Sequence, residues 1–97
     1  MTGKQRAYLR SLANGLDTIL TVGKGGLTEN VIQQADEALT ARELIKGRVL
    51  ETAMMTAAEA CAALAAATGA EGVQSIGSRF VLYRPNPNEP KLRLPKG

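Results

Sequence analysis

The sequence predicts an α/β fold, a two-layer sandwich in the order α-β-α-β-α-β-β with a four-stranded mixed sheet. Two observations support this prediction. Apolar residues recur at helical spacing in three segments, and runs typical of strands follow each of these segments. Right-handed crossovers place the first three strands parallel, and the last hairpin adds an antiparallel strand. With 97 residues and 44% apolar content, the chain can form one hydrophobic core but not two.

The first half of the chain predicts a helix, a strand and a second helix. Apolar residues at helical spacing predict a helix over residues 4–14. The run over residues 18–22 is typical of a strand. A second apolar stripe predicts a helix over residues 28–40. Thr28 is a good N-cap for it, and Glu29 puts a favourable negative charge in the first turn.

The middle of the chain predicts a strand and a helix with small side chains. Residues 43–50 predict the second strand, in which alternation puts Lys46 and Arg48 on one face. Gly47 interrupts this strand where a β-branched residue would be favoured. The third helix is expected over residues 53–68 and should pack closely against the sheet. Its apolar stripe contains Met54, Ala57, Ala58, Cys61, Leu64 and Ala65.

The end of the chain predicts a hairpin followed by a tail. Strands are expected near residues 73–77 and 79–84, with a turn at Gly77-Ser78. We therefore expect a single domain over residues 1–84 and a basic, flexible tail over residues 85–97.

Three prolines prevent regular structure at the start of this tail, because proline lacks a backbone N–H and fixes φ. The tail then serves solubility or contacts a polyanion through its cations. In the alternative, Leu92 and Leu94 fold back onto the core, and truncation would lower the melting temperature.

The composition excludes several classes of function. The chain has no histidine and one cysteine, which argues against histidine acid–base catalysis, Cys/His zinc sites and an internal disulfide. Cys61 lies in an Ala-rich segment and is expected to be a buried structural thiol. Three aromatic residues are too few for a base-stacking platform. No segment predicts a signal peptide or a membrane span, so we expect a cytoplasmic protein with no cofactor.

The charge is distributed unevenly. Residues 1–27 carry a net charge of +3, residues 28–78 carry −4, and residues 79–97 carry +4. Such an asymmetry is expected when one surface meets a polyanion and another stays solvated.

The most informative motif is Gly23-Lys24-Gly25-Gly26, between the first strand and the second helix. It matches neither the Walker nor the dinucleotide pattern. What remains is G-x-x-G, the spacing with which KH domains hold about four nucleotides of backbone. Glycine permits close approach of a ligand, the amides of residues 26–30 can meet a phosphate, and Lys24 adds a cation. The same spacing also suits a plain strand-to-helix turn.

Three segments of the chain carry a more specific signal together. They span residues 22–29, 43–46 and 80–85, and they resemble the CRM domain (chloroplast RNA splicing and ribosome maturation) in its stand-alone bacterial, YhbY-like form. The resemblance covers about residues 3–85 in order and spacing. It implies a fold similar to the C-terminal domain of translation initiation factor 3. It also implies RNA binding through the G-x-x-G loop and association with precursors of the large ribosomal subunit.

The resemblance also indicates which residues bind RNA. The loop residues carry over by position, and cations on a sheet or helix surface extend the site. The candidates are Gly23, Lys24, Gly25, Gly26, Thr28, Lys46, Arg48 and Arg84. Sequence readout should be weak, because stacking aromatics are scarce.

We therefore expect a non-catalytic, monomeric protein that binds rRNA in large-subunit precursors and can also contact ribosomal proteins. Two alternatives remain. One is a protein-docking module on assembling ribosomes with incidental rRNA contact, and the other is a small phosphotransfer or hydrolytic enzyme, for which no base, nucleophile and metal set is evident. A basic stripe continuous with the loop would favour RNA binding, whereas an exposed apolar patch far from it would favour docking.

Overall fold

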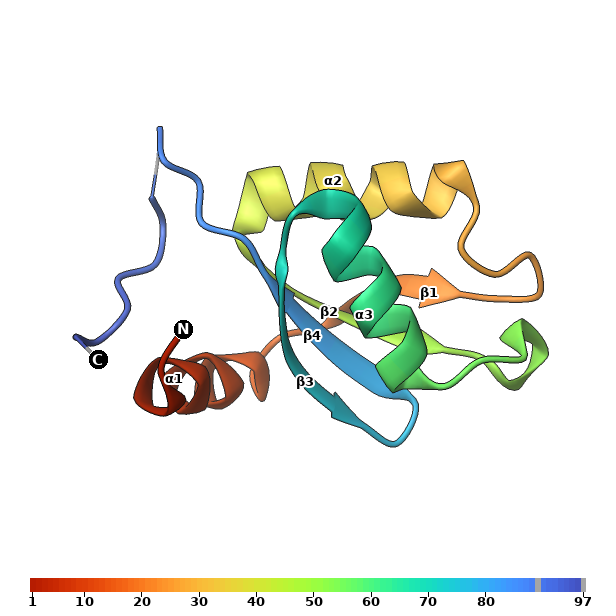
Figure 1. Ribbon diagram of the computed structural model, residues 1–97, viewed down its shortest axis with the longest axis horizontal. Helices are drawn as coiled ribbons and strands as arrows, with labels where there is room; N and C mark the ends of the chain where they lie inside the picture. The colour runs from red at the N-terminus through yellow and green to blue at the C-terminus, as the bar shows by residue number, and fades with distance from the viewer. Residues whose placement is uncertain (89, 97) are drawn as a thin grey trace.

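The predicted fold class and element order are confirmed. The computed structural model describes residues 1–88 and 90–96, which form three α-helices, a one-turn 3-10 helix and a four-stranded sheet (Figure 1). In chain order the elements are α1 (Gly3–Ala13), β1 (Thr18–Val22), α2 (Glu29–Arg42), β2 (Leu44–Val49), η1 (Glu51–Ala53), α3 (Ala57–Thr68), β3 (Glu71–Ile76) and β4 (Arg79–Tyr83). Apart from the third helix, the predicted bounds differ from these by at most two residues.

The sheet is mixed, with strand order β1-β2-β4-β3. β1 and β2 pair in parallel, while β4 is antiparallel to both β2 and β3. The first three strands therefore share one direction, as predicted. The closing strand inserts between β2 and β3, which gives β4 two hydrogen-bonded neighbours.

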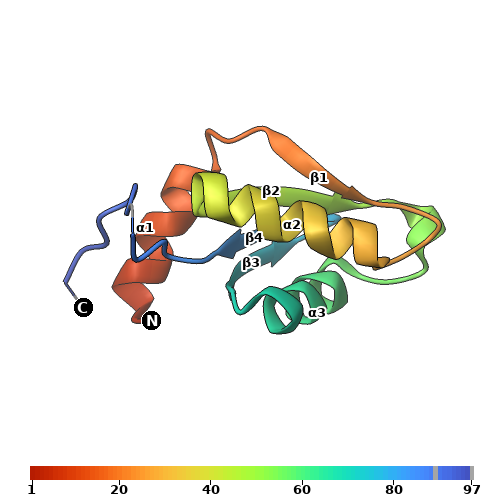
Figure 2. The same cartoon turned by 90° about the horizontal axis from the view of Figure 1, so that it is seen from above.

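Helices pack on both faces of the sheet (Figure 2). α2 and α3 cover one face over the larger buried cluster, to which β1, β2 and β4 contribute. α1 packs on the opposite face at one end only. The buried cluster beneath α1 consists of Leu9, Ala13, Leu44, Val73, Val81 and Tyr83. The half of this face that lies toward the 23–26 loop is left open to solvent.

Gly47 has a packing reason that the sequence pattern did not reveal. It lies opposite Phe80 in the β2–β4 register, and Phe80 is almost fully buried. A Cβ atom at Gly47 would lie only 2.4 Å from Cζ of that ring. The aromatic ring therefore occupies the space that a side chain would fill, and glycine is required for this close approach.

The predicted start of the third helix was wrong, and so was the placement of Met54 in the core. Thr56 and Glu59 form a capping box, each side chain accepting from the other residue's backbone N–H at 3.0 and 2.9 Å. α3 therefore begins at Ala57, and Met54 lies before it with its side chain 90% exposed. The predicted burial of Cys61 is confirmed, and burial raises the pKa of its thiol.

Candidate nucleic-acid interface

The 23–26 loop is a tight turn with an exposed tip. The Gly26 N–H donates to the Gly23 carbonyl at 2.9 Å, and Lys24 and Gly25 lie exposed between them. Gly26 has a φ of 69°, in the left-handed region that favours glycine. A Cβ atom at Gly23 or Gly25 would make only ordinary contacts. The fold itself thus requires only Gly26, and Gly25 remains free to serve close approach of a ligand.

The start of α2 presents backbone donors beside this turn. The Thr28 hydroxyl accepts from the Val31 N–H at 3.2 Å, which confirms the predicted N-cap. The amides of Glu29 and Asn30 have no acceptor within the helix, as is usual in a first turn. The Gly26 amide is already used in the turn, so it does not join the set of donors that the sequence predicted. The Glu29 carboxylate is in the same turn, so its charge offsets that of Lys24, and further positive charge must come from elsewhere on the surface.

A second group of cations lies on the open face of the sheet. Lys46 and Arg48 share this face, as the alternation in β2 predicted. Arg79 lies directly opposite Arg48 in the β2–β4 register. We call Lys46, Arg48 and Arg79 the basic face. The two ion pairs within the described residues, Arg6–Glu71 and Arg84–Asp36, involve none of its members.

The basic face is at the same end of the sheet as the loop. Thr21 of β1 pairs with Arg48 of β2, and Gly23 follows Thr21 by two residues. Leu50, which follows β2, donates from its N–H to the Val22 carbonyl at 2.9 Å. The loop follows the end of β1 (Figure 1), the strand that pairs with β2, so it lies next to the edge of the basic face.

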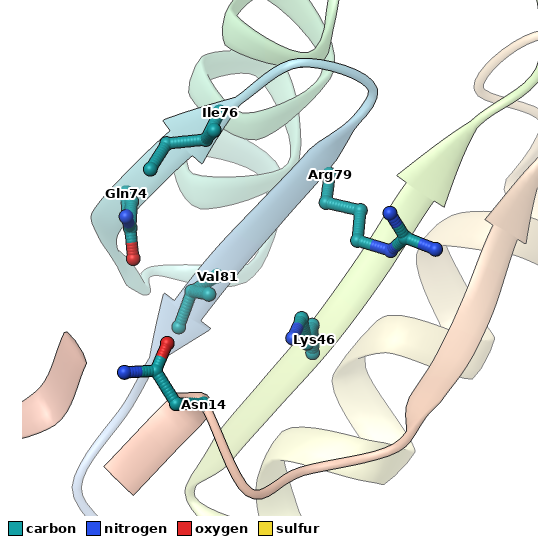
Figure 3. A pocket seen from close by; sticks show the side chains of 6 residues that line it. All are labelled: Asn14, Lys46, Gln74, Ile76, Arg79 and Val81. Atoms are coloured by element: carbon teal, nitrogen blue, oxygen red, sulfur yellow. The ribbon is translucent and has the colours of Figure 1, made fainter. Parts of the chain in front are cut away.

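Figure 3 shows a hollow on this open face. Its volume is about 200 Å³. Its lining combines two cations, two amides and two apolar side chains contributed by α1's C-terminal cap, β2, β3 and β4. The lining residues are Asn14, Lys46, Gln74, Ile76, Arg79 and Val81. In the described part of the chain, no group of His, Cys, Asp and Glu side chains could hold a metal ion.

Comparison with known proteins identifies the family. The model of the CRS1/YhbY (CRM) domain matches residues 1–84. The chain belongs to this family. The resemblance inferred from the three sequence segments is thereby confirmed, and the match ends where the tail begins.

Relatives of this CRM domain cover nearly its whole length. A Bacillus subtilis protein named Probable RNA-binding protein YqeI is 42% identical over 95 residues, which covers 98% of this chain and 99% of the relative. A Haemophilus influenzae protein named RNA-binding protein is 38% identical over 96 residues, with 99% and 96% covered. The solution structure of a hypothetical Staphylococcus aureus protein, described as a candidate RNA-binding protein, has 43% identity and a TM-score of 0.77. That match covers 98% of this chain and 99% of the Staphylococcus aureus chain.

Arg84 is not brought together with the other candidate residues. Its guanidinium group donates to Asp36 Oδ1 at 2.6 Å and to the Asp36 carbonyl at 3.0 Å. It also donates to Thr40 Oγ1 and to the Thr68 carbonyl, both at 2.8 Å. In this CRM domain Arg84 therefore ties the end of β4 to α2 and α3, at the end of the sheet remote from the loop.

Glu43 was not predicted as a site residue, yet it is the one charged residue that is buried among residues 1–88 and 90–96. It ends α2 with a φ of 65° and is 0% exposed. Its carboxylate accepts from the backbone N–H groups of Asn86 at 2.7 Å, Leu92 at 2.9 Å and Lys91. Burial raises the pKa of Glu43, but these three hydrogen bonds and the Lys91 charge outweigh it, so the pKa lies below its ordinary value.

The tail packs against the domain through its leucines as well. Leu92 and Leu94 contact the buried cluster beneath α1. Together with the hydrogen bonds to Glu43, these contacts favour the interpretation in which the tail folds back onto the core.

The longest extent of the molecule is 39 Å, and the tail and the loop lie toward opposite ends of this axis (Figure 1). Within the described residues, no helix is long and apolar enough to cross a bilayer.

Proposed function

We propose that this CRM domain is a non-catalytic RNA-binding protein that binds rRNA in precursors of the large ribosomal subunit. The observation that carries this proposal is the basic face. Its three cations form no ion pair within the described chain, and it continues into the loop. Family membership and the names of the relatives support RNA as the polyanion.

The loop holds the RNA backbone in this proposal. Gly25 lets a phosphate approach the main chain, the first-turn amides of α2 donate to its oxygens, and Lys24 neutralises its charge. The left-handed Gly26 fixes the turn that presents Lys24.

The basic face extends this footprint along the sheet. Arg48 and Arg79 stand side by side without a counter-ion, so an RNA phosphate between them would remove their mutual repulsion. Each neutralised phosphate also releases counter-ions, which makes the affinity depend on salt.

The positions of the exposed apolar side chains favour RNA binding over the docking alternative. Leu50 and Met54 lie in the segment beside the loop, and Ile76 lines the hollow on the basic face. The other large exposed apolar residues in the described chain are Met1, Tyr8 and Ile19. Three of these six exposed residues thus lie beside the loop or in the hollow, next to the cations, rather than far from them.

Crosslinking in cells followed by sequencing of the bound RNA tests this proposal. We expect reads concentrated in precursors of large-subunit rRNA, and their loss when Arg48 and Arg79 are both replaced by Glu. Reads spread evenly over cellular RNA, or crosslinks confined to ribosomal proteins, would contradict it.

A further inference from the structure

We propose that the hollow on the basic face receives one unstacked nucleotide of single-stranded RNA and recognises its base through Asn14 and Gln74. This inference rests on the proposed function and adds a specificity site to it. The scarcity of aromatic residues predicts weak sequence readout. The hollow offers a different route, through hydrogen bonds rather than stacking.

Three strands and the cap of α1 build this hollow. Val81 is almost fully buried and forms an apolar floor, while Ile76 is 65% exposed at the rim. Figure 3 shows Gln74 and Ile76 on β3 and Asn14 at the end of α1. At about 200 Å³, the hollow is large enough for one nucleobase but not for a helix of RNA.

The two amides match what a base edge requires. Each carries an N–H donor and a carbonyl acceptor, which is the combination that pairs with a base edge. Within the described chain, neither the Asn14 nor the Gln74 side chain has a hydrogen-bond partner. The Watson–Crick edge of a base is free for side chains only when the nucleotide is unpaired, whereas A-form duplexes are recognised mainly by shape and by their 2′-hydroxyl and phosphate groups. The site therefore suits a single strand.

The cations around the hollow suit the phosphates on either side of that base. Arg79 lies opposite Arg48, and like charges in this arrangement repel each other. The hydrogen bond of Lys46 Nζ is a long one, 3.5 Å to the Ala13 carbonyl. An acidic peptide would satisfy these cations but would leave the two amides without a specific role. Cations, amides and an apolar floor in one hollow therefore favour a nucleotide.

Binding of homopolymeric RNA decamers tests this inference. Dissociation constants would be measured for rA, rC and rU decamers with the full chain and with Gln74→Ala. Gln34→Ala, at an exposed position on α2, is the matched control. We expect the full chain to prefer one decamer over the poorest by about fivefold or more. Gln74→Ala should bring all three within about twofold, mostly by weakening the preferred decamer, while Gln34→Ala keeps the preference.

A spectroscopic readout separates base recognition from charge. The side-chain amide ¹H–¹⁵N resonances of Asn14 and Gln74 should shift with the preferred decamer and not with inorganic polyphosphate, which has the charge but no base. Equal shifts with polyphosphate, displacement of the decamer by an equimolar Asp decapeptide, or equal affinity for all three decamers would overturn the inference.

The two proposals fail in different ways. If the full chain binds the three decamers equally and the Lys24→Asp/Gly25→Asp variant loses that binding, RNA binding stands and the base site is wrong. If the full chain binds neither the decamers nor an rRNA fragment, both the proposed function and the base site are wrong.

Discussion

The two ends of this molecule use arginine for opposite purposes. At the loop end, Arg48 and Arg79 lie opposite each other on β2 and β4, and neither forms an ion pair within the described residues. At the tail end, Arg84 is 21% exposed and its guanidinium group is held by a carboxylate, a hydroxyl and two carbonyls. The comparison shows that an arginine is available for a ligand only where the fold supplies no internal partner.

The carboxylates follow the same division. At the tail end, Asp36 binds Arg84, and Glu43 is buried under three backbone amides. These contacts hold the tail and the strand ends in place. At the loop end, Arg48 and Arg79 form no ion pair within the described residues, so the stability of the fold depends little on them. We therefore expect substitutions at the tail end to change stability and those at the loop end to change RNA binding.

Removing the tail should have the largest effect. Deletion of residues 85–97 removes the three backbone N–H donors of the Glu43 carboxylate and the packing of Leu92 and Leu94. We expect the free energy of unfolding to fall by about 3–5 kcal/mol, as measured by urea denaturation. An unchanged midpoint would show that the tail is a detached arm.

The salt dependence of RNA binding, compared between a long RNA and a decamer, is a second measurement on the same deletion variant. Lys91, Arg93 and Lys96 are lost, so the salt dependence for a long single-stranded RNA should become shallower by up to about two units of slope, at about 0.7 per phosphate. A decamer bound at the loop end should keep its slope. Equal changes for both lengths would place the tail next to the loop-end site.

Replacing Glu43 by Gln should have the next largest effect on stability. The substitution keeps the size of the side chain but removes the charge and puts an N–H₂ group against backbone donors. We expect a loss of about 2 kcal/mol of stability at pH 7, with RNA affinity unchanged. Glu51→Gln, at an exposed position in η1, serves as the control and should leave both quantities unchanged.

Lowering the pH should remove the contribution of Glu43 to stability. Its pKa is lowered in the folded protein, so its stabilising effect is fully present above the ordinary value of 4.5 and is lost as the pH falls through the lower, folded pKa. The stability difference between the unchanged chain and Glu43→Gln should therefore be full at pH 7 and shrink below pH 4.5. A difference that grows in acid would reverse the sign and contradict this assignment.

Single alanine substitutions should separate the two kinds of arginine. Arg84→Ala should cost about 1.5 kcal/mol of stability and leave the RNA affinity unchanged, because its four partners are internal. Arg79→Ala should leave stability equal, or raise it by about 0.2 kcal/mol or more as its repulsion with Arg48 is relieved. It should also weaken RNA binding and reduce the salt slope by about 0.7. The opposite pattern would exchange the roles of the two ends.

Local patterns in the sequence were sufficient for much of the fold and the loop. The cap at Thr28 and the shared face of Lys46 and Arg48 depend on residues a few positions apart, and both are confirmed. The capping box at Thr56 and Glu59 was also a local signal, but the two residues look like interruptions in an Ala-rich run, and Met54 was placed in the core as a result.

The rest depends on contacts that no local pattern contains. Arg79 joins Arg48 only through the strand register, and Gly47 is explained only by the ring of Phe80. Arg84 meets Asp36 across 48 positions, so its guanidinium group could be taken for a surface cation. Glu43 and the tail are linked over a similar separation, which is why periodicity predicted only a strand start and a loose tail.

RNA binding by Lys24→Asp/Gly25→Asp tests the central claim most directly, because this variant changes the loop tip alone. A Cβ atom at Gly25 makes only ordinary contacts, so the thermal unfolding curve should stay the same. Gly3→Asp/Lys4→Asp is the matched control, with the same residue types and charge change in the first turn of α1, where a Cβ atom at Gly3 meets nothing. We predict that the loop variant binds an rRNA fragment about tenfold or more weakly, about 1.4 kcal/mol, and that the control loses far less. Equal binding by the folded loop variant and the unchanged chain would contradict the claim that this loop holds RNA.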